Sequence, residues 1–133
     1  MERVIVDTSV FVAVERGQPV AAGPLRADDD AAYAAITAAE LLAGVHRAQL
    51  AQRAGRLELI EARLAAIDCL PYDLDVARAH AELLAHTTAT GTPRGAHDLI
   101  IAATAKATGR QLITLDRRGF EGLPGVRVRV REG

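Results

Sequence analysis

The stretch VIVDTSVF, residues 4–11, decides the fold of this chain. Three apolar β-branched residues in a row are typical of a strand that is buried on both faces. The run ends abruptly on the carboxylate of Asp7, and the hydroxyls of Thr8 and Ser9 follow it. Either hydroxyl is a suitable cap for a helix that begins there. The stretch therefore predicts a buried strand that passes directly into a helix, with an acid at the junction.

The composition is that of one globular domain, and we assign all of residues 1–133 to it. The formal net charge is only −1, so any polyanion must be bound by a local site rather than by the overall charge. The single cysteine, Cys69, cannot form an internal disulfide, and no apolar run approaches the roughly 20 residues that span a bilayer. We therefore expect a cytoplasmic protein without a membrane segment.

Short apolar strands alternate with amphipathic helices along the chain. The expected strands are residues 3–6, 32–36, 69–72, 111–115 and 126–130, and the expected helices are residues 8–16, 37–52, 55–66, 75–88 and 96–108. This alternation predicts an α/β fold in which a mainly parallel central sheet is covered by helices on both faces.

Four carboxylates fall at the junctions between these elements. Asp7 and Asp116 directly follow strands, whereas Glu40 and Asp98 lie in the first turns of the helices 37–52 and 96–108. In an open parallel sheet the carboxyl ends of the strands and the amino ends of the following helices lie along one edge. The four acids are therefore expected to converge on that edge.

Each acid alone also has a purely structural explanation. Thr37 and Glu40 have the spacing of a capping box, and Asp98 complements a helix dipole. However, the segment LIIAA that follows Asp98 is apolar on every side, which indicates a buried helix. Several carboxylates near a core repel one another unless a cation joins them. Together the acids favour a site for a hard divalent cation, Mg²⁺ or Mn²⁺, with oxygen ligands.

The segments VIVDTSVF, AITAAELLAG, HDLIIAATAKATG and LITLDRRGF occur in the order and at about the spacing of the PIN-domain ribonucleases. The chain resembles that family from residue 4 to about residue 128, and its short form resembles the VapC toxins of bacterial VapBC toxin-antitoxin modules. It departs from the pattern at Arg94, where relatives often carry an aliphatic residue, and at His97, which replaces a small residue.

The resemblance implies a PIN-like three-layer fold and a particular set of site residues. The metal-binding and catalytic acids are Asp7, Glu40, Asp98 and Asp116, and the hydroxyls of Thr8 and Thr114 support them. Arg117 and Arg118 adjoin Asp116 and are candidate RNA contacts.

The implied activity is that of a Mg²⁺- or Mn²⁺-dependent endoribonuclease, which hydrolyses RNA phosphodiester bonds as the toxin of a type II toxin-antitoxin system. The implied partners are the RNA substrate, a cognate VapB-like antitoxin and a second copy of the chain in a homodimer. The helices 37–52 and 55–66 carry more apolar residues than one small core absorbs, so we expect them to form much of the antitoxin groove.

Rival functions explain the acids less well. A phosphotransferase of the haloacid-dehalogenase type needs Asp-x-Asp after its first strand, whereas here Asp7 is followed by Thr8 and Ser9. A receiver-type phosphorylation module needs a lysine after a late strand, but the one lysine, Lys106, falls in an expected helix. The alternative left open is a catalytically silent PIN-like module that acts only through a protein partner.

Overall fold

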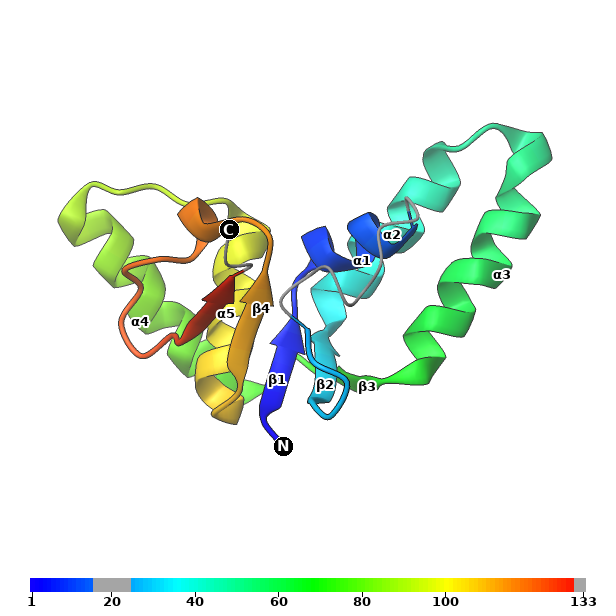
Figure 1. Cartoon of the computed structure of the whole chain (residues 1–133). Coiled ribbons are helices and arrows are strands. Elements are labelled where there is room, and N and C mark those ends of the chain that lie inside the picture. Colours follow the sequence, from blue (N-terminus) through cyan, green and yellow to red (C-terminus); the bar gives the residue numbers. More distant parts are fainter. Residues whose placement is uncertain (16–24, 131–133) are drawn as a thin grey trace.

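Five parallel strands form the central sheet of the computed structural model, which describes residues 1–15 and 25–130. The strands are β1 (Arg3–Val6), β2 (Asp30–Ala34), β3 (Asp68–Leu70), β4 (Gln111–Thr114) and β5 (Val128–Val130). They lie in the order β3-β2-β1-β4-β5, and each described pair is parallel (Figure 1). β1 is the central strand, which explains why its Val-Ile-Val run is apolar throughout.

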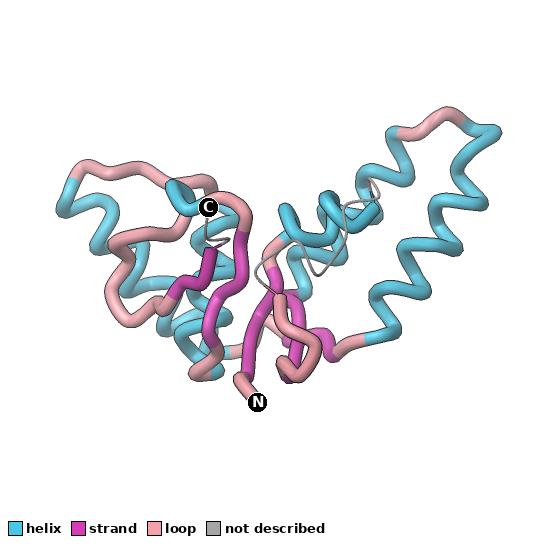
Figure 2. Tube along the Cα trace, viewed as in Figure 1, coloured by secondary structure: helices cyan, strands magenta, loops and turns pink. Residues whose placement is uncertain are grey.

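Helices cover both faces of this sheet. They are α1 (Thr8–Glu15), α2 (Ala35–Arg47), α3 (Leu50–Ala66), α4 (Leu74–Thr90), α5 (Ala96–Thr108) and the short 3₁₀ helix η2 (Arg117–Gly119). Figures 1 and 2 show α4 and α5 on one side of the sheet and α1, α2 and α3 on the other. This arrangement confirms the predicted α/β fold of three layers.

The side chains of β1 alternate between the two faces of the sheet and so contribute to the core on both sides. Ile5 packs in a cluster with Leu83 of α4 and Leu99 of α5, whereas Val4 and Val6 belong to a cluster on the opposite face. Successive residues of a strand point to opposite faces, so a strand covered on both sides must be apolar at every position. The core therefore fixes the end of β1, and with it the position of the acid that follows.

The helix boundary near residue 50 differs from the prediction. The sequence predicts helices 37–52 and 55–66, but α2 ends at Arg47 and α3 already begins at Leu50. Ala48 is extended, with ψ 159°, and its N–H donates to the carbonyl of Val45 at 3.0 Å. This turn lets α3 fold back so that Ile60 packs with Val45. Gly55 is exposed within α3, where glycine costs only about 1 kcal/mol and does not end a helix.

The structure excludes the alternative explanation of Glu40 as part of a capping box, and its expected place in the first turn is wrong. α2 begins at Ala35, and its N-cap, Ala34, makes no side-chain cap hydrogen bond. Glu40 therefore lies in the second turn and not in the first. The cause is the register of β2, in which Asp30 pairs with Arg3, so the strand ends two residues earlier than the predicted strand 32–36.

The remaining boundaries differ by a few residues. The strands predicted at 69–72 and 126–130 are observed as β3 and β5 with shorter bounds, and the helix predicted at 75–88 is observed as the slightly longer α4. The predicted end of the first helix, at Arg16, Gly17 and Pro19, lies outside the described residues. Within residues 1–15 and 25–130, no helix combines the length and the apolar character needed to cross a membrane.

Candidate active site

Asp7 lies at the carboxyl end of the central strand, where it is only 3% exposed. Its backbone N–H donates to the carbonyl of Ile113 at 3.0 Å, which extends the pairing of β1 with β4 by one residue. Two hydroxyls donate to its carboxylate, Ser9 Oγ to Oδ1 and Thr114 Oγ1 to Oδ2, both at 2.6 Å. Burial raises the pKa of Asp7 above its ordinary value, although these hydrogen bonds favour the charged form. The carboxylate is thus held in one orientation.

The same two hydroxyls also bind the chain that leaves β4. Thr114 Oγ1 accepts a hydrogen bond from the backbone N–H of Asp116 at 2.9 Å, and Ser9 Oγ accepts one from that of Leu115 at 3.1 Å. The ends of two neighbouring strands are therefore joined through side chains. The supporting position of Thr114 agrees with the sequence, whereas Ser9 is a site residue that the sequence analysis missed. The sequence feature that could have identified Ser9 was its position two residues after Asp7.

Glu40 reaches the same edge from α2. Thr8 Oγ1, at the first residue of α1, donates to Glu40 Oε1 at 2.8 Å, and the ring nitrogen Nδ1 of His97 lies 3.4 Å from Oε2. Thr8 Oγ1 also lies 3.2 Å from Oγ1 of the buried Thr37. Three elements far apart in the sequence, α1, α2 and α5, therefore meet at this carboxylate.

Asp98 lies in the first turn of α5 and interacts with all three other acids. Burial raises its pKa, and the negative charges of Asp7, Asp116 and Glu40 raise it further, while His97 opposes them. Because the charges of all three other acids add to the effect of burial on the pKa of Asp98, the four acids interact electrostatically. The structure thus brings together Asp7, Glu40, Asp98 and Asp116, and their catalytic and metal-binding roles stay predictions.

Two glycines leave room beside the Asp98 carboxylate. A Cβ added to Gly95 would lie 3.0 Å from Oδ2 of Asp98. A Cβ added to Gly119 would lie 3.1 Å from the same oxygen and 3.2 Å from Oδ2 of Asp116. Any larger residue at either position would press on these oxygens, so the glycines keep them accessible. Neither glycine was identified from the sequence.

The donor chemistry of this group suits a hard divalent cation. All four groups offer carboxylate oxygens, which Mg²⁺ and Mn²⁺ prefer, and their mutual repulsion is relieved by positive charge. Within the described ranges, no three His, Cys, Asp or Glu side chains are already arranged as a set of metal ligands. The carboxylates therefore suit the ion by donor type and by charge, whereas their side chains are not arranged as a complete ligand set.

The surroundings of the acid group are polar and open. Arg117 and Arg118 are exposed on η2, directly after Asp116. Beside Glu40 lies a hollow of about 500 Å³ between α1, α2 and α3. Its lining comprises Thr8, Val12, Glu40, Leu41, Gly44, Arg47 and Arg56. A bound molecule that is longer than one reacting group would thus have space and positive charge next to the acids.

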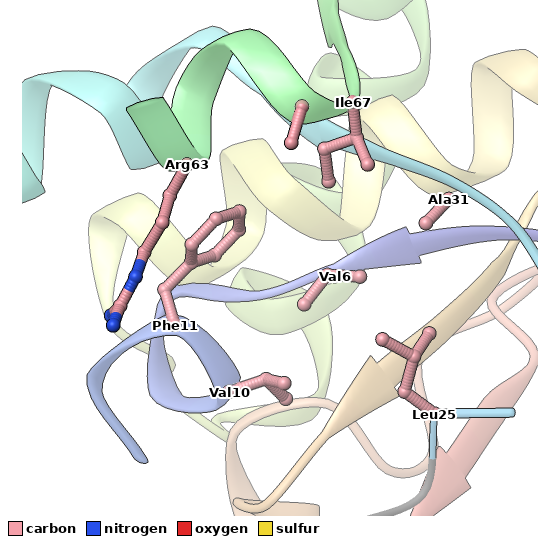
Figure 3. Close-up of a pocket in the computed structure, with 8 residues that line it drawn as sticks. Val6, Val10, Phe11, Leu25, Ala31, Arg63 and Ile67 are labelled. Atoms are coloured by element: carbon pink, nitrogen blue, oxygen red, sulfur yellow. The ribbon is translucent and has the colours of Figure 1, made fainter. Parts of the chain in front are cut away.

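A second pocket, of about 170 Å³, has a different character. It is lined by Val6, Val10, Phe11, Leu25, Ala31, Arg63, Ala66 and Ile67, and none of the four acids contributes to it. Figure 3 shows the Arg63 side chain running past the Phe11 ring at one side of this apolar space. The pocket offers no group for acid-base or metal chemistry, so the candidate active site is the acid-lined edge.

A three-layer α/β fold with a parallel sheet and an acid-lined edge defines a class of proteins that bind ligands at the carboxyl ends of their strands. Comparison with known proteins is consistent with this class. The family model described as PIN domain matches residues 4–125. Ribonuclease VapC of Rickettsia bellii is 31% identical over 125 residues, which cover 93% of this chain and 92% of that protein. Ribonuclease VapC5 of Mycobacterium tuberculosis is 37% identical over 113 residues, covering 84% and 82%.

A solved structure agrees with these relatives. The crystal structure of VapBC-5 from Mycobacterium tuberculosis, a member of the VapBC family of toxin-antitoxin systems, matches with a TM-score of 0.75 at 33% identity. The match covers 96% of this chain and 98% of that chain. The present chain belongs to the PIN-domain family and is VapC-like, which confirms the family predicted from its sequence.

Proposed function

We propose that the chain is a Mg²⁺- or Mn²⁺-dependent endoribonuclease that acts as the toxin of a type II toxin-antitoxin module. The observation that carries this proposal is the convergence of four carboxylates at one edge of the sheet, where burial and the charges of the other three raise the pKa of Asp98. Repulsion of this kind costs stability and is relieved by a bound cation. The VapC relatives named as ribonucleases support the same chemistry.

The residues of the edge have distinct tasks in this proposal. Asp7, Glu40, Asp98 and Asp116 would hold Mg²⁺ or Mn²⁺, which would supply positive charge for a phosphate and for activation of a water molecule as the nucleophile. Asp7, oriented by Ser9 and Thr114, is the buried ligand at the floor of the site. Asp98 and Asp116 approach it from α5 and from the end of β4.

Glu40 completes the acid group from the side of α1 and α2. Thr8 holds one of its carboxylate oxygens, while the other faces His97. The carboxylate is thereby available to bind the ion directly or to orient a water molecule beside it. Either task requires only that its position be fixed, and the hydroxyl of Thr8 does this.

RNA would extend from the acids along the polar surface around them. The exposed Arg117 and Arg118 supply positive charge on one side, and the hollow lined by Glu40, Arg47 and Arg56 supplies space on the other. Contacts of arginine with phosphates position a nucleic acid without reading its bases. These arginines are therefore proposed to bind substrate rather than to select its sequence.

The proposed partners are a VapB-like antitoxin and a second copy of the chain. The matched structure of VapBC-5 is that of a toxin-antitoxin system, which supports an antitoxin as partner here. The alternative, a catalytically silent module, shares this partner but predicts that the purified chain leaves RNA intact.

The decisive experiment is RNA cleavage by purified protein. We expect cleavage with Mg²⁺ or Mn²⁺, its loss on chelation with EDTA, and a reduction of at least about a hundredfold in Asp98→Asn, which keeps shape but removes a ligand charge. Asp75→Asn is the matched control, because Asp75 also lies in the first turn of a helix, α4, but far from the acids in sequence and exposed.

Each result discriminates between the two functions. If Asp98→Asn cleaved RNA as fast as wild type at saturating Mg²⁺, the assignment of Asp98 would be lost. No cleavage by the wild-type protein, despite tight antitoxin binding, would favour the silent module.

A further inference from the structure

Arg94 lies in the loop that leads into α5 and binds the turn that follows Asp116. Its Nη1 donates to the backbone carbonyl of Arg118 at 3.1 Å, and its Nη2 donates to that of Glu121 at 2.7 Å. Its guanidinium thus joins the loop before α5 to two carbonyls that lie 24 and 27 positions further along the sequence.

The turn bound by Arg94 lies directly against two of the acids. Gly119, between the two carbonyls, approaches Asp98 and Asp116 so closely that a Cβ would lie 3.1 Å and 3.2 Å from their Oδ2 atoms. The φ of Gly119 is not positive, so close approach, and not backbone conformation, accounts for glycine at this position. Arg94 therefore holds in place the backbone that lies directly against these two carboxylates.

We propose that Arg94 is a positioning residue of the metal site. It ties the turn 117–121 to the start of α5, and so keeps the Asp116 carboxylate beside that of Asp98 for binding one divalent cation. The inference rests on the proposed metal-dependent function. Ligands held in place before the ion arrives need no ordering when it binds, so loss of this tie should lower the affinity for the ion.

The chemistry of arginine explains why this residue is needed. A planar guanidinium reaches two carbonyl oxygens at once through separate nitrogens, whereas a lysine ammonium is a compact point charge without that fork. The positive charge of Arg94 acts in the opposite direction, because it repels a metal cation. Loss of the two hydrogen bonds of Arg94 should therefore weaken metal binding, whereas loss of its positive charge alone should strengthen it.

The test is calorimetric titration of Mn²⁺ into RNA-free protein. Arg94→Lys keeps the charge but loses the fork, and Arg94→Met loses both. We expect Arg94→Lys to bind Mn²⁺ about tenfold more weakly than wild type, the scale seen when partners that orient metal ligands are removed. Arg94→Met should be weakened less, because the loss of its positive charge offsets part of the loss of the two hydrogen bonds. Arg127→Met is the matched control, because Arg127 Nη2 also donates to a backbone carbonyl, that of Gly109 at 3.1 Å, near the start of β4. It should bind Mn²⁺ as wild type does.

Unchanged or tighter Mn²⁺ binding by both Arg94 variants would overturn the positioning role. Absence of Mn²⁺ binding by wild type would instead overturn the metal site of the proposed function, so the two failures are distinguishable. Gly119→Ala provides a second variant at the same contact, and it should also weaken Mn²⁺ binding because its Cβ presses on both carboxylates.

Cleavage kinetics give an independent readout. At limiting Mn²⁺ the kcat of Arg94→Lys should fall, and at saturating Mn²⁺ it should return to the wild-type value with an unchanged KM for RNA. A KM that stays raised at saturating Mn²⁺ would identify Arg94 as an RNA contact and would overturn the positioning role.

Discussion

Asp7 and Asp98 are chemically identical residues in two different environments. Asp7 accepts hydrogen bonds from the hydroxyls of Ser9 and Thr114, which offset part of the cost of burial. The pKa of Asp98 is raised by burial and then by the charges of its neighbours, and no hydrogen bond to its carboxylate is found among the described residues. In metal-free protein the Asp98 charge is therefore repelled by three neighbouring carboxylates, and His97 opposes this repulsion.

The first prediction at the residue scale concerns the melting temperature of Asp98→Asn. Without metal the variant should melt at a higher temperature than wild type, because it removes one charge from the repelling group. Mn²⁺ should raise the melting temperature of wild type but scarcely that of the variant, since a ligand stabilises the state that binds it. Thermal melts in EDTA and in Mn²⁺ measure both effects. If the variant melted lower in EDTA and wild type did not respond to Mn²⁺, Asp98 would serve only the helix dipole.

Residue patterns were sufficient to place the acids but not to identify their partners, of which only Thr8 and Thr114 were named, from the family resemblance. Each acid lies where a strand ends or near where a helix begins, and the parallel sheet carries those junctions to one edge. The hydroxyl that orients Asp7 comes from Thr114, 107 positions away, and the carbonyls that bind Arg94 lie at least 24 positions away. Such pairs depend on register and loop shape, which residue patterns within one element do not encode.

At the scale of the elements, Arg110 joins three strands at the opposite edge of the sheet. It lies directly before β4 and is 7% exposed, and its Nη1 donates to the carbonyls of Val4 in β1 at 3.1 Å and of Asp30 in β2 at 2.8 Å. Its Nε atom has no hydrogen-bond partner among the described residues. The buried guanidinium thus binds the strands from their amino ends, away from the acids.

Arg110→Met should therefore lower the free energy of unfolding by about 3 kcal/mol, because two buried hydrogen bonds from a charged donor are lost. Arg78→Met is the control, since its pair with Asp75 at 3.1 Å is exposed and should contribute less than about 0.5 kcal/mol. Urea unfolding at neutral pH measures both. Equal effects of the two substitutions would contradict the strand-joining role of Arg110.

At the scale of the whole molecule, the hairpin of α2 and α3 extends away from the sheet (Figure 1). Its apolar residues fall into two sets. Leu41, Val45, Ile60 and Leu64 are buried in one cluster with Tyr33, whereas Leu57 and Leu59 are 42% and 44% exposed. The fold therefore buries only part of the apolar surface of these two helices. The exposed part is the surface that we assign to the proposed antitoxin groove.

Leu59→Asp should weaken binding of the cognate antitoxin by at least about tenfold, equivalent to about 1.4 kcal/mol, because a charge replaces a contact in an apolar groove. Leu84→Asp on α4 is the matched control, since Leu84 is exposed to a similar extent, 46%, but lies on the other side of the sheet. Calorimetry of the purified pair gives both dissociation constants. Equal affinities of Leu59→Asp and wild type would remove α3 from the groove.

The pH dependence of stability depends on carboxyl groups whose pKa values are shifted in opposite directions. Burial is the main cause that raises the pKa of Asp7 and of Asp98 above 3.8, so the folded state binds protons that the unfolded state releases. The stability that these groups contribute falls as the pH rises through their folded pKa. Burial opposes the shift of Asp29, but its hydrogen bond from Arg129 at 2.7 Å lowers the pKa below 3.8. The contribution of Asp29 is present above 3.8 and is lost as the pH falls through its folded pKa.

The contribution of Asp7 and Asp98 to the stability of the metal-free protein should therefore rise as the pH is lowered through their folded pKa toward 3.8, and the contribution of Asp29 should fall at lower pH. Mn²⁺ should reverse the first of these trends, because it stabilises the ionised carboxylates and protons compete with it. Melting temperatures across this range, with EDTA and with Mn²⁺, test both signs. In the metal-free protein, Asp98→Asn should reduce the gain in melting temperature as the pH is lowered toward 3.8. It should leave the decrease in melting temperature at lower pH unchanged, because that decrease is due to Asp29. If metal-free wild type and Asp98→Asn instead gained stability to the same extent as the pH rises toward neutral, the four acids would not repel one another as a group. Their charges would then give no electrostatic reason to bind a shared cation.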